Sequence, residues 1–257
     1  MAAHLHAHGP KRYITEKDIV RRGALSCIAS PSETEGPYYV SGMPYRKNIT
    51  EGRPGLPLTL TITVLDLASC LPTSKNLTLE LWHCDHLGIY SHYEEASKSF
   101  SNPKTDNNKY FRGKTLIDQS TGIAVFETIY PGWYTGRDIH FHVRVWSGSS
   151  ILLTTQFSFN DTITATVQKI SPYTSNTNQR TYLLTDTVFS DNGVLGMLDI
   201  QQKSSSDITK GFNAYVSMGV SLNGTTVTTN NGTTVANFAV SVNSGLVSLL
   251  LILVLMF

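Results

Sequence analysis

One segment, residues 131–142, constrains this chain more than any other: Pro-Gly-Trp-Tyr-Thr-Gly-Arg-Asp-Ile-His-Phe-His. The Pro-Gly pair is typical of a turn, and the alternation of polar and apolar residues over 138–146 predicts a β-strand. Strand side chains repeat with period two, so we expect His140 and His142 on the same face. Neutral imidazole is the commonest metal ligand in proteins. The spacing therefore predicts two side chains that can bind one ion.

The turn before this strand contains Tyr134. A phenolate oxygen is a hard ligand that suits Fe(III), and a metal can hold the phenol deprotonated far below its free pKa of about 10. Two other interpretations of the segment stay open. His140 and His142 can be ordinary polar residues of a strand, and Tyr134 can be a turn tyrosine that caps a sandwich.

A second segment lies upstream, at residues 81–91: Leu-Trp-His-Cys-Asp-His-Leu-Gly-Ile-Tyr-Ser. It predicts a short strand, a glycine-containing turn and an exposed tyrosine, Tyr90. Together with the downstream segment it resembles the intradiol ring-cleavage dioxygenases, non-haem iron(III) enzymes that open catechols between the two hydroxyls. The segments 34–39 and 155–157 match the same family, and the resemblance runs from about residue 31 to about residue 220.

The resemblance implies a ligand set and a cofactor, Fe(3+). The family's two tyrosines and two histidines fall on Tyr90, Tyr134, His140 and His142, and its active-site arginine falls on Arg137. It also implies small-molecule catechols and O2 as partners, with a cis,cis-muconate-type diacid as product.

The same resemblance implies roles for three residues. Tyr134 would leave the metal and accept a substrate proton, and Arg137 would stabilise negative charge on the substrate ring. Gln156 is a weaker candidate, as a hydrogen-bond donor near the ligands. A structural arginine paired with Asp85 or Asp138 is the other interpretation of Arg137. For the whole chain, the alternative is a metal-free or inactive β-sandwich binding module at the cell surface.

The rest of the pattern predicts an all-β fold, a β-sandwich with long active-site loops. Short strands separated by turn residues are typical of sandwiches, and little of the chain predicts a long amphipathic helix. Residues 94–109 predict a long polar loop, either at the rim of the iron site or simply on the surface. The expected strands are 58–66, 77–85, 122–129, 138–146, 152–159 and 213–222.

The sequence divides into four parts. Residues 1–30 predict a polar, disordered leader and residues 31–222 the catalytic sandwich, followed by a linker rich in Thr, Asn and Gly at 223–245. Residues 246–257 are almost all apolar but too few to span a bilayer, which takes about 20 residues. A spacer followed by a terminal apolar tail indicates a GPI-attachment signal.

That tail predicts a secreted or cell-surface protein with a possible membrane tether, although no signal peptide is visible in this chain. Five Asn-x-Ser/Thr triplets point weakly the same way. In an oxidising compartment a bridge between Cys70 and Cys84 is reasonable, and free thiols are the other interpretation. A formal net charge of +1 with no basic stripe argues against a nucleic-acid partner. The oligomeric state stays open.

Overall fold

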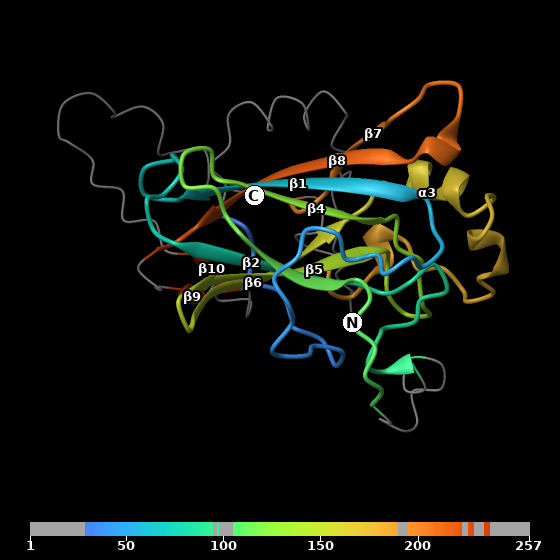
Figure 1. The fold of residues 1–257 in the computed structure, drawn as a ribbon, viewed down its shortest axis with the longest axis horizontal. Helices are drawn as coiled ribbons and strands as arrows, with labels where there is room; N and C mark the ends of the chain where they lie inside the picture. Colours follow the sequence, from blue (N-terminus) through green and yellow to red (C-terminus); the bar gives the residue numbers. More distant parts are fainter. Residues whose placement is uncertain are drawn as a thin grey trace, which may run out of the picture.

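The computed structural model describes residues 29–94, 97, 105–189, 195–222, 226–228 and 234–236, and the fold is that of these residues. They form two four-stranded sheets packed face to face, with short helical turns at one end (Figure 1). The first sheet has the order β4-β1-β8-β7. Its strands are β1 (Pro57–Asp66), β4 (Ile123–Ile129), β7 (Asp199–Gln202) and β8 (Phe212–Val220).

The second sheet has the order β3-β2-β5-β6 and is antiparallel throughout. Its strands are β2 (Leu77–Trp82), β3 (Arg112–Leu116), β5 (His140–Ser147) and β6 (Ser150–Ser158). A separate pair of short strands, β9 (Thr226–Thr228) and β10 (Thr234–Ala236), lies in the segment expected to be a linker. The helical elements that lie wholly within the described residues are α3 (Asp161–Val167) and three 3-10 helices, η1 (Tyr173–Ser175), η2 (Leu183–Thr185) and η3 (Ile208–Lys210).

The core lies between the two sheets, where alternate residues of each strand point inward. β1 contributes Leu58, Leu60 and Ile62, and β5 contributes Val143 and Val145, all buried. Burying one such aliphatic side chain contributes about 1.5–3 kcal/mol. Because the inner face uses the odd-numbered positions of β5, the even-numbered ones point outward, and these include both histidines.

The all-β sandwich is confirmed, and each of the six expected strands has a counterpart. The strand expected at 77–85 ends earlier, at Trp82, because the chain then turns at 85–88. Four strands were not predicted: β3, β7 and the short pair β9 and β10 in the expected linker. β3 contains charged residues and a glycine, and β7 is polar, so neither shows the apolar alternation that marks a strand.

The bridge between Cys70 and Cys84 is wrong, because both thiols are free. Cys84 is buried in the aromatic cluster beside the site, while Cys70 is exposed. Burial explains the error, since Cys84 turns its Sγ toward the carbonyl oxygen of Gly132 at 3.6 Å, on the interior side of its turn.

The expected leader and apolar tail lie outside the described residues, apart from Ala29 and Ser30. Their boundaries and the GPI signal therefore stay predictions. Among the residues that the structure describes, no helix is long and apolar enough to cross a membrane.

Candidate metal centre

Four side chains meet at one end of the second sheet, on its outer face. Nε2 of His140 lies 3.0 Å from Nε2 of His142, and the phenol oxygen of Tyr90 lies 3.3 Å and 3.1 Å from these two nitrogens. The phenol oxygen of Tyr134 lies 3.4 Å from Nε2 of His140. The structure therefore brings together the four residues that the sequence predicts as ligands.

The two histidines are held in different ways. Nδ1 of His140 lies 2.5 Å from the carbonyl oxygen of Asp138, which can only accept, so Nδ1 carries the proton and Nε2 offers a lone pair. His142 has no hydrogen-bond partner for its buried Nδ1 among the described residues. Its ring instead stacks on the indole of Trp82, with centroids 5.0 Å apart and planes 6° from parallel.

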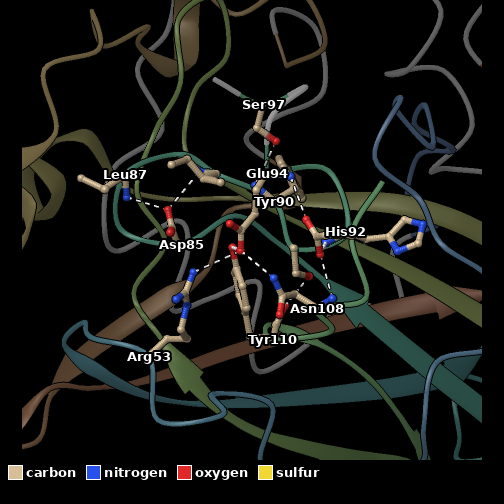
Figure 2. Close-up of polar contacts among 12 residues, drawn as sticks. Arg53, Asp85, Leu87, Tyr90, His92, Glu94, Ser97, Asn108 and Tyr110 are labelled. Atoms are coloured by element: carbon tan, nitrogen blue, oxygen red, sulfur yellow. Dashed lines mark hydrogen bonds and ion pairs between the residues drawn. The ribbon is translucent and has the colours of Figure 1, made fainter. Parts of the chain in front are cut away.

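A tight turn after β2 positions Tyr90. The Asp85 carboxylate accepts the backbone N–H groups of Leu87 and Ile89, and these two hydrogen bonds stabilise the turn (Figure 2). Gly88 has φ +84°, and a Cβ there would collide with the carbonyl of Trp133. Only glycine lets this turn press against the backbone that precedes Tyr134, and this contact brings the two tyrosine loops together.

The chain after Tyr90 is fixed by a second carboxylate, that of Glu94 (Figure 2). Its Oε1 accepts hydrogen bonds from Tyr110 at 2.9 Å and Asn108 at 2.9 Å, and pairs with Arg53 at 3.5 Å. Ser97 Oγ accepts the backbone N–H of Tyr90 itself at 3.1 Å. The described ends of the expected long loop are thus anchored to each other and to Tyr90, while 95–96 and 98–104 lie outside the described residues.

The two tyrosines differ in exposure. The expectation that Tyr90 is exposed is wrong, because Tyr90 is fully buried with the ring of Tyr38 stacked on it at 4.6 Å. Tyr134 sits in the loop between β4 and β5 and is only partly buried. Its neighbour Trp133 is buried and donates to the carbonyl of Asn178, so it is a packing residue. Tyr134 is therefore the more accessible of the two tyrosines.

Arg137 lies at the same end of the sheet, but neither expected structural partner holds it. Its Nε pairs with the carboxylate of Asp186 at 2.8 Å, and its Nη2 donates to Oε1 of Gln156 at 2.7 Å. The alternative interpretation, a pairing with Asp85 or Asp138, is therefore wrong. Gln156 completes its contacts by donating from Nε2 to the carbonyl of Thr34 at 2.8 Å. Its side-chain hydrogen bonds thus go to Arg137 and Thr34 rather than to the four convergent side chains.

Sequence reasoning missed three residues that border the site. Asp186 holds Arg137, and Phe189 places its ring 6.1 Å from that of His140. Arg112, which is 1% exposed, lies with its guanidinium carbon 5.8 Å from the ring of Tyr90. Asp186 and Phe189 follow the histidines by more than forty residues, and no spacing signal connects them to the motif.

Burial controls the protonation states at the centre. It lowers the pKa of His140 and of His142 well below the usual value, with the charge of Arg137 acting in the same direction, so both imidazoles are neutral. Burial also raises the pKa of Tyr90 and of Tyr134 well above 10. Neutral imidazole is the ligating form, and a cation is needed to hold either phenol as phenolate.

These donors fit a metal ion. Ligand atoms about 2.1 Å from a common ion, at angles between about 90° and 109°, lie about 3.0–3.4 Å apart. The four separations, 3.0 to 3.4 Å, fall within that range. No group of three or more His, Cys, Asp or Glu side chains in the described part of the chain could hold a metal. The donors that converge here are two imidazole nitrogens and two phenol oxygens.

Comparison with known proteins agrees with this arrangement. The model of the dioxygenase family matches residues 34–180, more than half of the 257 residues. The chain belongs to this family, whose fold and chemistry are those of the intradiol ring-cleavage dioxygenases. Comparison with curated proteins finds no match.

Solved structures of the same class resemble the chain. An intradiol ring-cleavage dioxygenase from Tetranychus urticae is 27% identical, with a TM-score of 0.67 over 76% of this chain and 95% of that one. Two others share the fold. Hydroxyquinol 1,2-dioxygenase from Pseudomonas putida is 19% identical, with a TM-score of 0.53 over 79% of this chain and 71% of that one. Catechol 1,2-dioxygenase from Acinetobacter is 21% identical, with a TM-score of 0.52 over 81% of this chain and 69% of that one.

Proposed function

We propose that this protein is a non-haem Fe(III) dioxygenase that opens a catechol-type ring between its two hydroxyls, using O2, to give a cis,cis-muconate-type diacid. The observation that carries the proposal is the convergence of Tyr90, Tyr134, His140 and His142 within 3.0–3.4 Å. Two imidazole nitrogens and two phenol oxygens form a hard donor set with a preference for a trivalent ion. The family relationship supports the same reaction class.

In this proposal, Tyr90, Tyr134, His140 and His142 hold the iron. The chemistry that Fe(III) supplies when bound is chelation of both catechol oxygens, which makes the ring electron-rich enough to react with O2. The protein supplies the rest. His140 and His142 are 2% exposed, and aromatic rings cover the centre, so bulk water has little access to the bound substrate.

Tyr134 is the residue we assign to proton transfer. Its phenolate oxygen accepts the proton of a catechol hydroxyl as the substrate binds, because Tyr134 is the more exposed of the two tyrosines. Tyr90 cannot serve in the same way, since it is fully buried beneath Tyr38. One tyrosine thus exchanges a proton with the substrate while the other stays in place.

Arg137 supplies a fixed positive charge next to the reacting ring. Its side chain is 14% exposed, and Asp186 and Gln156 orient its guanidinium. A preorganised cation lowers the energy of negative charge that develops in the transition state, because the protein reorganises little as that charge appears.

Colour and product analysis test the function together. The protein purified with iron should be burgundy, because tyrosinate-to-Fe(III) charge transfer absorbs visible light. It should consume one O2 per catechol and release a diacid that carries both oxygen atoms, which mass spectrometry with labelled O2 detects. A colourless protein that binds no iron would contradict the proposal and favour the metal-free binding module.

A further inference from the structure

Asp186 is the most completely satisfied carboxylate near the site. It follows η2 and is 0% exposed. Its Oδ2 accepts hydrogen bonds from Nε of Arg137 at 2.8 Å and from the backbone N–H of Asp138 at 2.6 Å. Its Oδ1 accepts the backbone N–H groups of Val188 at 2.8 Å and Phe189 at 3.0 Å. These backbone hydrogen bonds fix the carboxylate, which can therefore hold Arg137 rigidly.

These contacts fix the orientation of the guanidinium. Arg137 uses Nε for Asp186 and Nη2 for Gln156, two acceptors from different elements. Its guanidinium carbon also lies 5.4 Å from the ring centroid of Phe189. Since the guanidinium is planar, two directed acceptors determine the position of its plane.

The same turn borders the four convergent side chains. Phe189 packs edge-on against the ring of His140 at 6.1 Å. The backbone N–H of Asp138 donates to Asp186, and its carbonyl oxygen accepts a hydrogen bond from Nδ1 of His140. Asp186 lies beyond the matched region 34–180, and sequence reasoning missed it. It contacts Asp138, which in turn contacts His140.

Charge explains why an acid occupies this position. An arginine buried without an anion is strongly destabilised, and a neutral acceptor such as Gln156 cannot compensate its charge. Burial alone would raise the pKa of Asp186, but the charge of Arg137 and the donated hydrogen bonds outweigh it and lower the pKa below its usual value. Asp186 is therefore ionised at neutral pH.

We propose that Asp186 is the positioning residue of this site: its buried carboxylate holds the Arg137 guanidinium in the orientation that stabilises charge on the bound ring. The inference rests on the function proposed above. It assigns a role to the contact between a distant turn and the arginine, and not to any contact of Asp186 with the substrate.

The first test uses the full-length wild-type protein purified without metal. NMR should show the Nε–H signal of Arg137, assigned by its loss in Arg137→Leu, exchanging with water at least about tenfold more slowly than that of Arg53. The side chain of Arg53 is 40% exposed, whereas that of Arg137 is 14% exposed. Exchange as fast as that of Arg53 would overturn the inference without reference to activity.

The second test substitutes the carboxylate in the iron-loaded enzyme. Asp186→Asn keeps the size of the side chain but removes its charge, so turnover should fall about 10- to 100-fold while iron content and colour stay unchanged, as for a misplaced group. Asp118→Asn is the control, because the Asp118 carboxylate also accepts hydrogen bonds within its own turn, after the end of β3 that lies away from the four ligands. It should leave kcat within about twofold. Loss of iron from Asp186→Asn would overturn the inference.

The third test separates positioning from general damage. If Asp186 acts through Arg137, then Asp186→Asn should change kcat by less than about twofold when Arg137 is already leucine. A multiplicative loss in the double variant would overturn the inference. Failure of the proposed function looks different: the wild-type protein itself would be colourless and would turn over no catechol.

Discussion

β1 and β5 are central strands of the two sheets, and their sequences alternate in the same way. β1 reads Pro-Leu-Thr-Leu-Thr-Ile-Thr-Val-Leu-Asp, and β5 reads His-Phe-His-Val-Arg-Val-Trp-Ser. Yet the threonines of β1 are only partly buried, whereas His140, His142 and Arg144 of β5 are almost completely buried. Alternation therefore identifies the face of each residue but not whether the polar face meets water.

The difference comes from what covers the outer face. Over β5 lie the turn that carries Tyr90, the loop that carries Tyr134 and the turn that contains Asp186 and Phe189, each of which contacts His140. Glu35 and Tyr39 of the segment 34–39 add further contacts, both with Arg144. The described contacts of β1 outside its sheet are fewer, and its outer positions carry small hydroxyl side chains. A polar strand face that is buried marks the site.

The largest effect should come from the metal-facing positions of β5. His142→Ala removes one of the two nitrogens that lie 3.0 Å apart, so we expect loss of iron and of visible absorption. Tyr134→Phe should lose the charge-transfer band of its phenolate. Metal analysis and absorption spectra measure both.

Thr63→Ala, on the outer face of β1, is the matched control and should keep iron and colour. Unchanged iron content and colour in both site variants would show that these residues do not bind the metal, and the comparison between the two strands would then lose its functional meaning.

Arg137→Leu should have the next largest effect. The variant should keep iron and colour, because in the proposed function Arg137 does not coordinate the metal. Turnover should fall, since the activation free energy should rise by about 2–4 kcal/mol, as on removal of one preorganised electrostatic group. Steady-state kinetics with a catechol give kcat and KM. Full turnover would exclude the role assigned to Arg137, and loss of iron would show that it supports the scaffold instead.

The sequence predicted the sandwich because β1, β4 and β8 bury alternate apolar residues, which is a local pattern. It also predicted that Tyr90, Tyr134, His140 and His142 act together, through spacing and resemblance. It could not predict Asp186 or the partners of Arg137, since these contacts join turns that are far apart in the sequence. Nor could it predict that Cys84 faces the interior, because one residue of register decides this.

A substitution of Arg144 tests whether the buried outer face of β5 contributes to the stability of the fold. Its Nε donates to Thr154 at 3.0 Å, its Nη2 pairs with Glu35, and its guanidinium lies 4.2 Å from the ring centroid of Tyr39. Arg144→Met should lower the free energy of unfolding by about 1–3 kcal/mol, because hydrogen bonds to a charged group and a cation–π contact are lost.

Thr61→Val, at the middle of β1, should change the unfolding free energy by less than about 0.5 kcal/mol, since a partly exposed position in a strand tolerates either residue. Urea unfolding of both variants measures the contrast. Equal losses would mean that the outer faces of the two sheets do not differ in packing.

The smallest effect concerns pH. Glu80 of β2 lies on the same outer face, is 1% exposed, and accepts from the indole of Trp146 at 2.8 Å. Burial raises its pKa, and this outweighs the opposing effects of Trp146 and Lys114. The folded state therefore binds the Glu80 proton more tightly than the unfolded state does. This contribution to stability is complete below the unfolded pKa of about 4.5 and is lost as the pH rises through the folded pKa.

Glu80→Gln keeps the acceptor for Trp146 but does not titrate. Compared with the wild type, the variant should become relatively more stable between pH 4 and pH 7, by an amount below that of the Arg144 substitution. Urea unfolding at the two pH values gives the unfolding free energy of the variant relative to the wild type at each pH. Glu127→Gln on β4 is the control, because the side chain of Glu127 is exposed. A constant difference between Glu80→Gln and the wild type would mean that Lys114 and Arg144 fully compensate the buried carboxylate.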